Sequence, residues 1–200
     1  MRKALLAVAA IGAFVVVVLV VYQVRLRREA AKWSGPLREI VEEKIEHEDG
    51  VTRSRFVTVL PAPVQQVEEV VWQIEKLQEV VPNFKIARLI EAQGNTKRVE
   101  LGIQALNLPL LRYEMEFIRY PQEHRVTFRT LKSQAQDIEG EYRLEPSPDG
   151  TKTRVVYTTT AREKVALPFP RSVLDSAGRE TFVNTVRGIE KLLQQPKATG

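Results

Sequence analysis

Few residues in this chain are of the types that carry out catalysis or bind metals. There are no cysteines, which excludes disulfides, thiolate metal sites and thiol nucleophiles. The two histidines, His47 and His124, are far apart in the sequence, and we expect both to be solvated side chains. Asp137 and Glu139 would share one face of a strand about 6–7 Å apart, and a charged outer face explains them better than an acid pair. The sequence therefore predicts no catalytic residue, no metal site and no cofactor.

Three tyrosines are the best candidates for polar groups inside a binding pocket. Tyr113, Tyr142 and Tyr157 lie in segments whose alternating pattern predicts strands. A buried phenol can donate a hydrogen bond to a ligand. The alternative is a core tyrosine whose hydroxyl is bonded within the protein.

The same strands are predicted to share one strongly apolar face. Large apolar side chains occupy every second position of the segments 97–105, 110–120, 124–132 and 137–145, and charged residues occupy the positions between them. The apolar stripe of a long C-terminal helix would pack against this face. The candidate pocket residues on these elements and on the segment 151–162 are Val99, Leu101, Ile103, Tyr113, Met115, Phe117, Phe128, Tyr142, Tyr157, Phe182 and Val186. An apolar pocket with a few polar groups suits a lipid, an isoprenoid or a polycyclic ligand, and an ordinary dense core is the alternative.

The order of the elements predicts an antiparallel sheet. A strand at 51–60 ends at Pro61-Ala62-Pro63 and leads into a helix from Val64 and a second short helix that Pro82 stops. The helical period returns only at 173–194. Between them lie six extended segments, at 84–92, 97–105, 110–120, 124–132, 137–145 and 151–162. We therefore expect an α+β fold, in which a curved antiparallel sheet of about seven strands wraps around the long C-terminal helix.

This order resembles the helix-grip fold of the START-like superfamily, also called SRPBCC, which includes the Bet v 1 allergens. The segment from Pro63 to Trp72, the Val81-Pro82 stop and the two late segments Asp137–Pro146 and Asp149–Tyr157 carry the resemblance. It covers residues 51–195, and it is strongest to the polyketide cyclase/Coq10-like branch. The resemblance implies a cavity between sheet and helix that holds a hydrophobic ligand.

The N-terminal segment is a different kind of sequence. Ala4–Val24 contains no charged residue and is long enough to cross a bilayer as a helix. A cleaved signal peptide is the alternative, but no suitable pair of small residues follows the apolar run. We therefore expect an uncleaved single-pass anchor at 1–28. Counting basic residues on the two sides favours a cytoplasmic body by about one charge.

The segment 29–50 is interpreted as a linker with an amphipathic helix. Ser34-Gly35-Pro36 would break the chain, and Leu37, Ile40, Val41 and Ile45 then recur at helical spacing. Residues 51–195 form the expected domain, and 196–200 a flexible tail.

Two connecting segments are unusually apolar. Residues 106–111 contain four leucines, and Ala166–Pro170 precedes the last helix. If both lie at one end of the body, they would form an apolar gate to the pocket or a contact with the bilayer; core packing is the alternative.

The charge distribution gives no support for a nucleic-acid partner. The net charge is +5, and the last fifty residues hold nine Lys and Arg against four Asp and Glu. No aromatic residues are interleaved with this basic stretch, so attraction to anionic lipid or a solvated face explains it better.

The resulting hypothesis is a membrane-anchored, non-catalytic binding protein for a hydrophobic ligand. A polyketide cyclase/aromatase-like enzyme and a protein–protein interaction domain at the membrane are the alternatives.

Overall fold

The computed structural model describes residues 2–106, 108–166 and 168–195, with side chains from residue 17 onward. These residues form two compact units, which divide between Gly35 and Pro36. The predicted tail at 196–200 lies outside the described residues.

The first unit is a single helix, α1 (Arg2–Trp33), of 32 residues. The apolar side chains from Val17 to Val21 are all exposed. Among the described residues, no helix is long and apolar enough to cross a membrane. The structure does not describe the side chains of residues 4–16, which form most of the predicted span. The anchor therefore stays a prediction.

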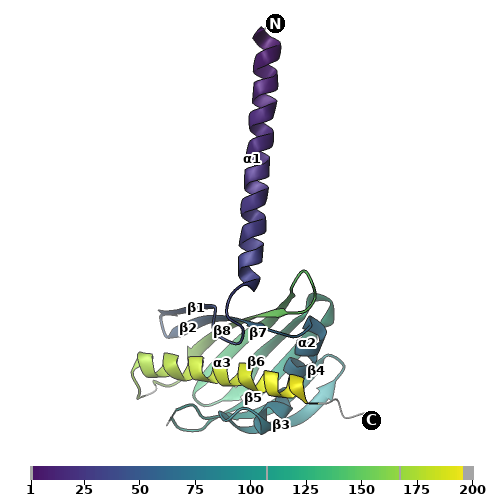
Figure 1. Cartoon of the computed structure of the whole chain (residues 1–200). Helices are drawn as coiled ribbons and strands as arrows, with labels where there is room; N and C mark the ends of the chain where they lie inside the picture. Colours follow the sequence, from purple (N-terminus) through teal and green to yellow (C-terminus); the bar gives the residue numbers. More distant parts are fainter. Residues whose placement is uncertain (1, 107, 167, 196–200) are drawn as a thin grey trace. The chain divides into compact units, whose positions relative to one another are not determined.

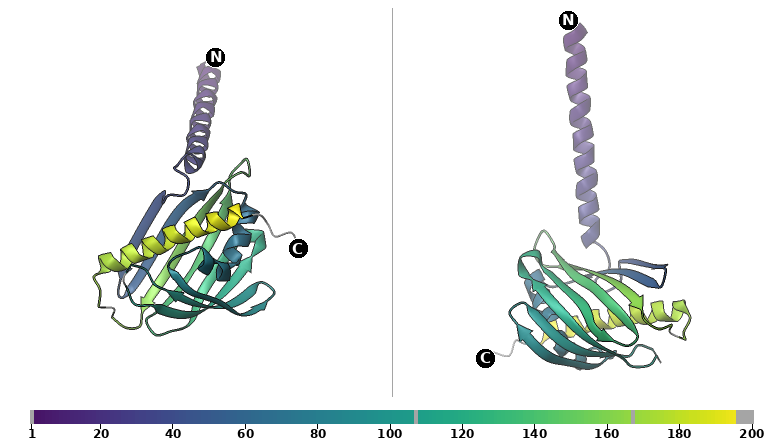
Figure 2. Two further views of the ribbon diagram at one scale, coloured as in Figure 1. Left: turned by 60° about the horizontal axis from the view of Figure 1, so that its bottom comes forward. Right: turned by 180° about the vertical axis from the view of Figure 1, so that it is seen from behind.

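The second unit is an eight-stranded antiparallel sheet with a long helix across one face (Figure 1). The sheet order is β1-β2-β8-β7-β6-β5-β4-β3, so each strand after β3 pairs with its predecessor and β8 closes onto β2. Figure 2 shows α3 crossing the strands on the inner side of the curved sheet. The strands are β1 (Glu42–Glu48), β2 (Val51–Leu60), β3 (Phe84–Gln93), β4 (Thr96–Ile103), β5 (Leu111–Tyr120), β6 (Arg125–Ser133), β7 (Gln136–Pro146) and β8 (Thr153–Glu163). The helices of this unit are α2 (Val64–Trp72), the 3-10 helices η1 (Ile74–Glu79) and η2 (Pro121–Glu123), and α3 (Arg171–Gln194).

The predicted α+β helix-grip architecture is confirmed, but the amphipathic helix predicted before Asp49 is wrong. That segment is β1, and all seven of its residues pair with β2. Asp49 and Gly50 both have positive φ angles, 49° and 75°, as a tight two-residue hairpin turn requires. The sheet therefore has one strand more than expected, and the folded body begins well before residue 51.

The helices begin where the sequence indicated. α2 follows Pro63, and its residues Val64, Val67 and Val71 are buried in the hydrophobic core. The second short helix is a 3-10 helix, η1, rather than an α-helix. α3 follows Pro170 and is the long C-terminal helix of the prediction.

The two halves of α3 have different surroundings. In the C-terminal half, Val186 and Ile189 belong to the core, and a Cβ on Gly188 would stand 2.4 Å from a methyl carbon of Val81. In the N-terminal half, a Cβ on Gly178 would meet no atom within 4 Å. The helix is therefore packed densely at one end and lies over open space at the other.

Candidate ligand-binding cavity

The open space under the N-terminal half of α3 is a cavity of about 250 Å³. Its floor is the inner face of the sheet, and Leu174 and Gly178 contribute to its roof. Nine predicted pocket residues line it: Leu101, Ile103, Tyr113, Met115, Phe117, Phe128, Tyr142, Tyr157 and Phe182. The other two, Val99 and Val186, do not line it and are part of the dense core.

Aromatic rings form one continuous wall of the cavity. The ring of Tyr157 lies 4.8 Å from that of Tyr142 and 5.5 Å from that of Phe182, measured between centroids. Phe128 stacks on Tyr157 at 5.7 Å, and Phe56 stacks on Phe182 at 5.1 Å. Offset ring contacts of this kind are favourable beyond the area that they bury. The rings therefore form a continuous aromatic surface on one side of the cavity.

Gly140 makes room for this wall. It pairs with Phe128 across β6 and β7, and a Cβ at Gly140 would stand 2.7 Å from the Phe128 ring. The same Cβ would stand 2.2 Å from the backbone oxygen of Thr158. Any larger residue would displace the ring or the strand.

The three predicted tyrosines differ in their hydrogen bonding. The hydroxyl of Tyr113 accepts a hydrogen bond from the Gln136 amide at 2.8 Å. The hydroxyls of Tyr142 and Tyr157 have no hydrogen-bond partner among the described residues. Burial raises the pKa of Tyr113 to about 12, and burial also raises the pKa values of Tyr142 and Tyr157. All three phenols are therefore neutral hydrogen-bond donors near neutral pH.

A histidine that the sequence analysis assigned to solvent lines the cavity instead. His47, on β1, places Nδ1 3.0 Å from the hydroxyl of Thr52 and Nε2 3.1 Å from a carboxylate oxygen of Asp175. All three side chains line the cavity. A carboxylate only accepts hydrogen bonds, so in the neutral imidazole Nε2 carries the proton and Nδ1 accepts from Thr52.

The first apolar connecting segment borders the cavity, and Val165, the residue before the second segment, lies near it. Leu108, Pro109 and Leu111 line the cavity. Leu110, Leu111 and Val165 together line a neighbouring surface hollow. Leu110 and Val165 keep 37% and 51% of their surface exposed, so this lip is apolar and open to solvent. Residues 107 and 167 lie outside the described residues.

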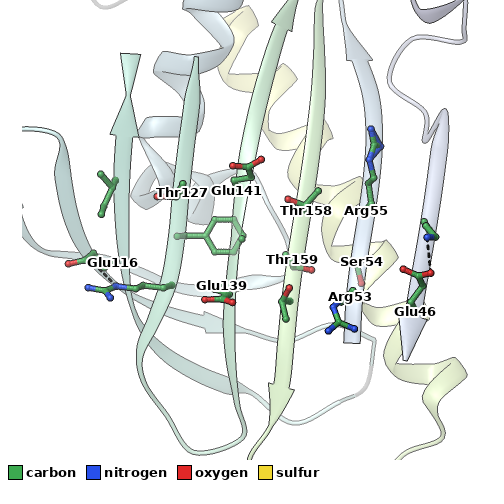
Figure 3. A pocket seen from close by; sticks show the side chains of 16 residues that line it. Glu46, Arg53, Ser54, Arg55, Glu116, Thr127, Glu139, Glu141, Thr158 and Thr159 are labelled. Atoms are coloured by element: carbon green, nitrogen blue, oxygen red, sulfur yellow. Dashed lines mark hydrogen bonds and ion pairs between the residues drawn. The ribbon is translucent and has the colours of Figure 1, made fainter. Parts of the chain in front are cut away.

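The opposite face of the sheet carries the charged residues (Figure 3). A hollow of about 620 Å³ there is lined by Arg53, Glu139, Glu141 and their neighbours, and its charges are largely paired. The Glu116 carboxylate accepts from Arg129 at 2.7 Å, and Lys44 lies 2.7 Å from Glu46. This hollow belongs to the charged outer face of the sheet that the sequence predicted.

His124 lies outside the cavity, beside the buried carboxylate of Glu68. Its Nδ1 is 2.7 Å from Glu68, whose other carboxylate oxygen accepts a hydrogen bond from Arg119 at 2.7 Å. Glu68 is 3% exposed, so this cluster joins α2 to the β5–β6 region. It therefore has a structural role rather than the solvated one that was expected. In the part of the chain that the structure describes, no group of three or more acidic or histidine side chains is placed to hold a metal ion.

Comparisons with solved structures show the same fold. The Zhui aromatase/cyclase from a Streptomyces species has a TM-score of 0.64 at 16% identity, covering 75% of this chain and 99% of that one. A STAR-related lipid transfer protein from Xanthomonas axonopodis has a TM-score of 0.57 at 14% identity, covering 76% and 99%. A START superfamily protein from Mycobacterium smegmatis has a TM-score of 0.58 at 13% identity, covering 72% and 97%. These likenesses establish the START-like fold of the body.

The sequence comparisons identify the family. Among curated proteins, none matches this sequence significantly. The sequence profile described as polyketide cyclase / dehydrase and lipid transport matches residues 50–194, which is most of the chain and nearly all of the sheet and helix of the body. The chain therefore belongs to the polyketide cyclase / dehydrase and lipid transport family.

Proposed function

We propose that the body is a binding protein for a compact hydrophobic ligand, which it stores, transfers or presents without changing it. The observation that carries the proposal is the cavity between α3 and the sheet, with its aromatic wall and apolar lip. The lining residues named above are the proposed contacts of the ligand. The family includes lipid transport in its description, and this agrees with the proposal.

The volume narrows the choice of ligand. At about 250 Å³ the cavity is slightly smaller than the range of about 300–1,000 Å³ that is usual for small-molecule sites. A ring system of roughly two or three fused rings fits this volume better than a long isoprenoid chain. The aromatic wall also favours a ring over a flexible chain.

The direct test is extraction of the purified full-length protein with organic solvent, followed by mass spectrometry. A ring compound that co-purifies in near-stoichiometric amount would support the proposal. An empty protein that also fails to bind any apolar fluorophore would contradict it.

One observation favours an enzyme as a second candidate function. The chain of contacts from Thr52 through His47 to Asp175 has the order hydroxyl, imidazole, carboxylate, which can move a proton to or from a bound molecule. To test this, a linear poly-β-ketone would be incubated with the protein and cyclised products measured by mass spectrometry. Products formed by the unchanged protein and lost in His47→Gln would establish catalysis. Equal product with both proteins, or none with either, would leave binding as the function.

We further propose that residues 4–24 anchor the protein in a membrane, with the body on the cytoplasmic side. The absence of charge over this run and the exposed valines from Val17 to Val21 support the anchor. The full-length protein should stay with membranes after a carbonate wash. Paired Val17→Arg and Val20→Arg changes should release it, because each charge costs about 2.5–3.5 kcal/mol at the centre of a span. Release of the unchanged protein would contradict the anchor.

A further inference from the structure

Residues 36–48 form an arm at the start of the body, and we call them the N-terminal arm. The backbone of the arm is bonded to β2, first at Arg38, whose N–H donates to the backbone oxygen of Val59 at 3.0 Å, and then along the whole of β1. The family profile starts only at residue 50. The N-terminal arm therefore lies outside the part of the chain that the profile describes.

The N-terminal arm also contacts α3, in antiparallel order and with opposite charges. The contacts are Arg38 with Glu190 at 2.6 Å, Glu43 with Arg179 at 2.9 Å, and His47 with Asp175 at 3.1 Å. At the first contact the arm supplies the positive group and the helix the negative one, and at the second the signs are reversed. β1 is the edge strand of the sheet on the side of the N-terminal half of α3 (Figure 1). The arm is therefore joined to the helix over most of its length.

These contacts hold two halves of α3 that are packed differently. The C-terminal half is also held by the buried side chains of Val186 and Ile189. The N-terminal half lies over the cavity, which Ile45 and His47 of the arm help to line. The polar contacts with β1 therefore hold the helix at the end where the core is not densely packed.

The Glu43–Arg179 pair is suited to open and close. Arg179 donates to Glu43 from both Nε and Nη2, a two-pronged contact that fixes the orientation of the two side chains. The Arg179 side chain is 47% exposed, and exposed ion pairs are weak and screened by salt. Neither residue lines the cavity. The pair can therefore affect the passage of a ligand without touching the bound ligand.

We propose that the N-terminal arm is a latch on α3. The Glu43–Arg179 and His47–Asp175 contacts break together, and the N-terminal half of the helix then lifts from β1 and lets a ligand enter or leave the cavity. The core packing around Ile189 keeps the C-terminal half in place. This inference rests on the proposed binding function and specifies how ligand exchange is controlled. The latch sets the rate of exchange rather than the affinity, because it changes entry and release alike.

The test follows the release of a neutral apolar fluorophore, N-phenyl-1-naphthylamine, from the full-length protein after rapid dilution. Glu43→Gln and Arg179→Gln should each release the fluorophore about three- to fivefold faster, because each removes one exposed ion pair. The affinity at equilibrium should change less than about twofold. Raising the salt concentration from about 0.1 M to about 1 M should speed release from the unchanged protein and have little effect on Glu43→Gln, because the screening length falls from about 10 Å to about 3 Å.

A covalent lock tests the movement itself. The chain contains no cysteine, so in a Glu43→Cys, Arg179→Cys double variant a short bis-maleimide can react only at these two positions. After cross-linking, the double variant should release the fluorophore at least about tenfold more slowly than before. The same protein is compared with itself, so a difference in folding between variants cannot produce this result.

Arg129→Gln is the matched control. Arg129 donates to Glu116 at 2.7 Å on the opposite face of the sheet, away from α3. The change removes an ion pair of the same kind, and it should leave the release rate and its dependence on salt as they are in the unchanged protein.

The outcomes separate the latch from the function on which it rests. Equal release before and after cross-linking, or unchanged release from both glutamine variants of the pair, would overturn the latch and leave hydrophobic binding intact. Failure of the unchanged protein to bind this or any other apolar fluorophore would overturn the binding function and the latch with it.

Discussion

The two halves of α3 show how one helix can serve stability at one end and binding at the other. Around Val186 and Ile189 the side chains are almost fully buried, and Gly188 is needed so that the helix can approach Val81. Around Gly178 the backbone of the helix borders empty space. Both halves carry apolar residues at helical spacing, so the difference lies in what the sheet places opposite them. The sheet packs closely against the C-terminal half of α3 and leaves a cavity under its N-terminal half.

The largest expected effect is at the packed end. Ile189→Ala should lower the free energy of unfolding by about 2–5 kcal/mol, because it leaves a cavity in a dense core. Leu174→Ala, at the hollow end, should cost less than half as much because its side chain already borders open space. Chemical denaturation of the full-length protein measures both. Equal losses would show that the two halves are packed alike.

The hollow end should also be sensitive to alkaline pH. The pKa of Tyr113 is raised to about 12 by burial, above its value of about 10 in the unfolded chain. The unfolded state therefore releases this proton first, and stability should fall as the pH rises from about 10 to about 12, by roughly 3 kcal/mol in all. Tyr113→Phe should reduce this fall, as measured by denaturation at several pH values. An unchanged pH dependence in that variant would show that the phenol is not buried in the folded state.

A matched pair of glycine substitutions sharpens the comparison. Gly188→Ala should destabilise the protein by about 1–3 kcal/mol, because the new methyl group would overlap the side chain of Val81. Gly178→Ala should stabilise it by up to about 1 kcal/mol, because alanine favours a helix and meets no neighbour there. Thermal unfolding distinguishes the two signs. The same sign for both would contradict the proposed difference in packing.

Much of this architecture could be predicted from the sequence because alternation and helical spacing report burial directly. The strands from Phe84 to Glu163 were predicted to within a few residues, and nine cavity residues were found because they share the inner face of those strands. What alternation cannot report is whether an inner residue borders packed atoms or empty space. Val99 and Val186 have the same pattern as their neighbours and still belong to the dense core.

The error at β1 had a specific cause and a specific consequence. Its glutamate-rich sequence favours a helix by propensity, and Ile45 fits a helical stripe. The Asp49-Gly50 turn and the pairing with β2 outweigh that preference, because an Asp-Gly pair is a strong hairpin signal. Once β1 is a strand, His47 lies opposite Thr52 and reaches Asp175, 128 positions away in the sequence. No local pattern could have shown that contact.

The central claim is that the space beneath Gly178 binds the ligand. Its most direct test is the binding of an apolar fluorophore to Gly178→Leu, with Gly178→Ala as the control. Leucine should fill the cavity from the helix side, so binding should fall at least tenfold while the protein stays as stable as before or becomes more stable. Alanine should leave most of the binding intact. Full binding by a folded Gly178→Leu protein would contradict the account, because the ligand would then lie elsewhere.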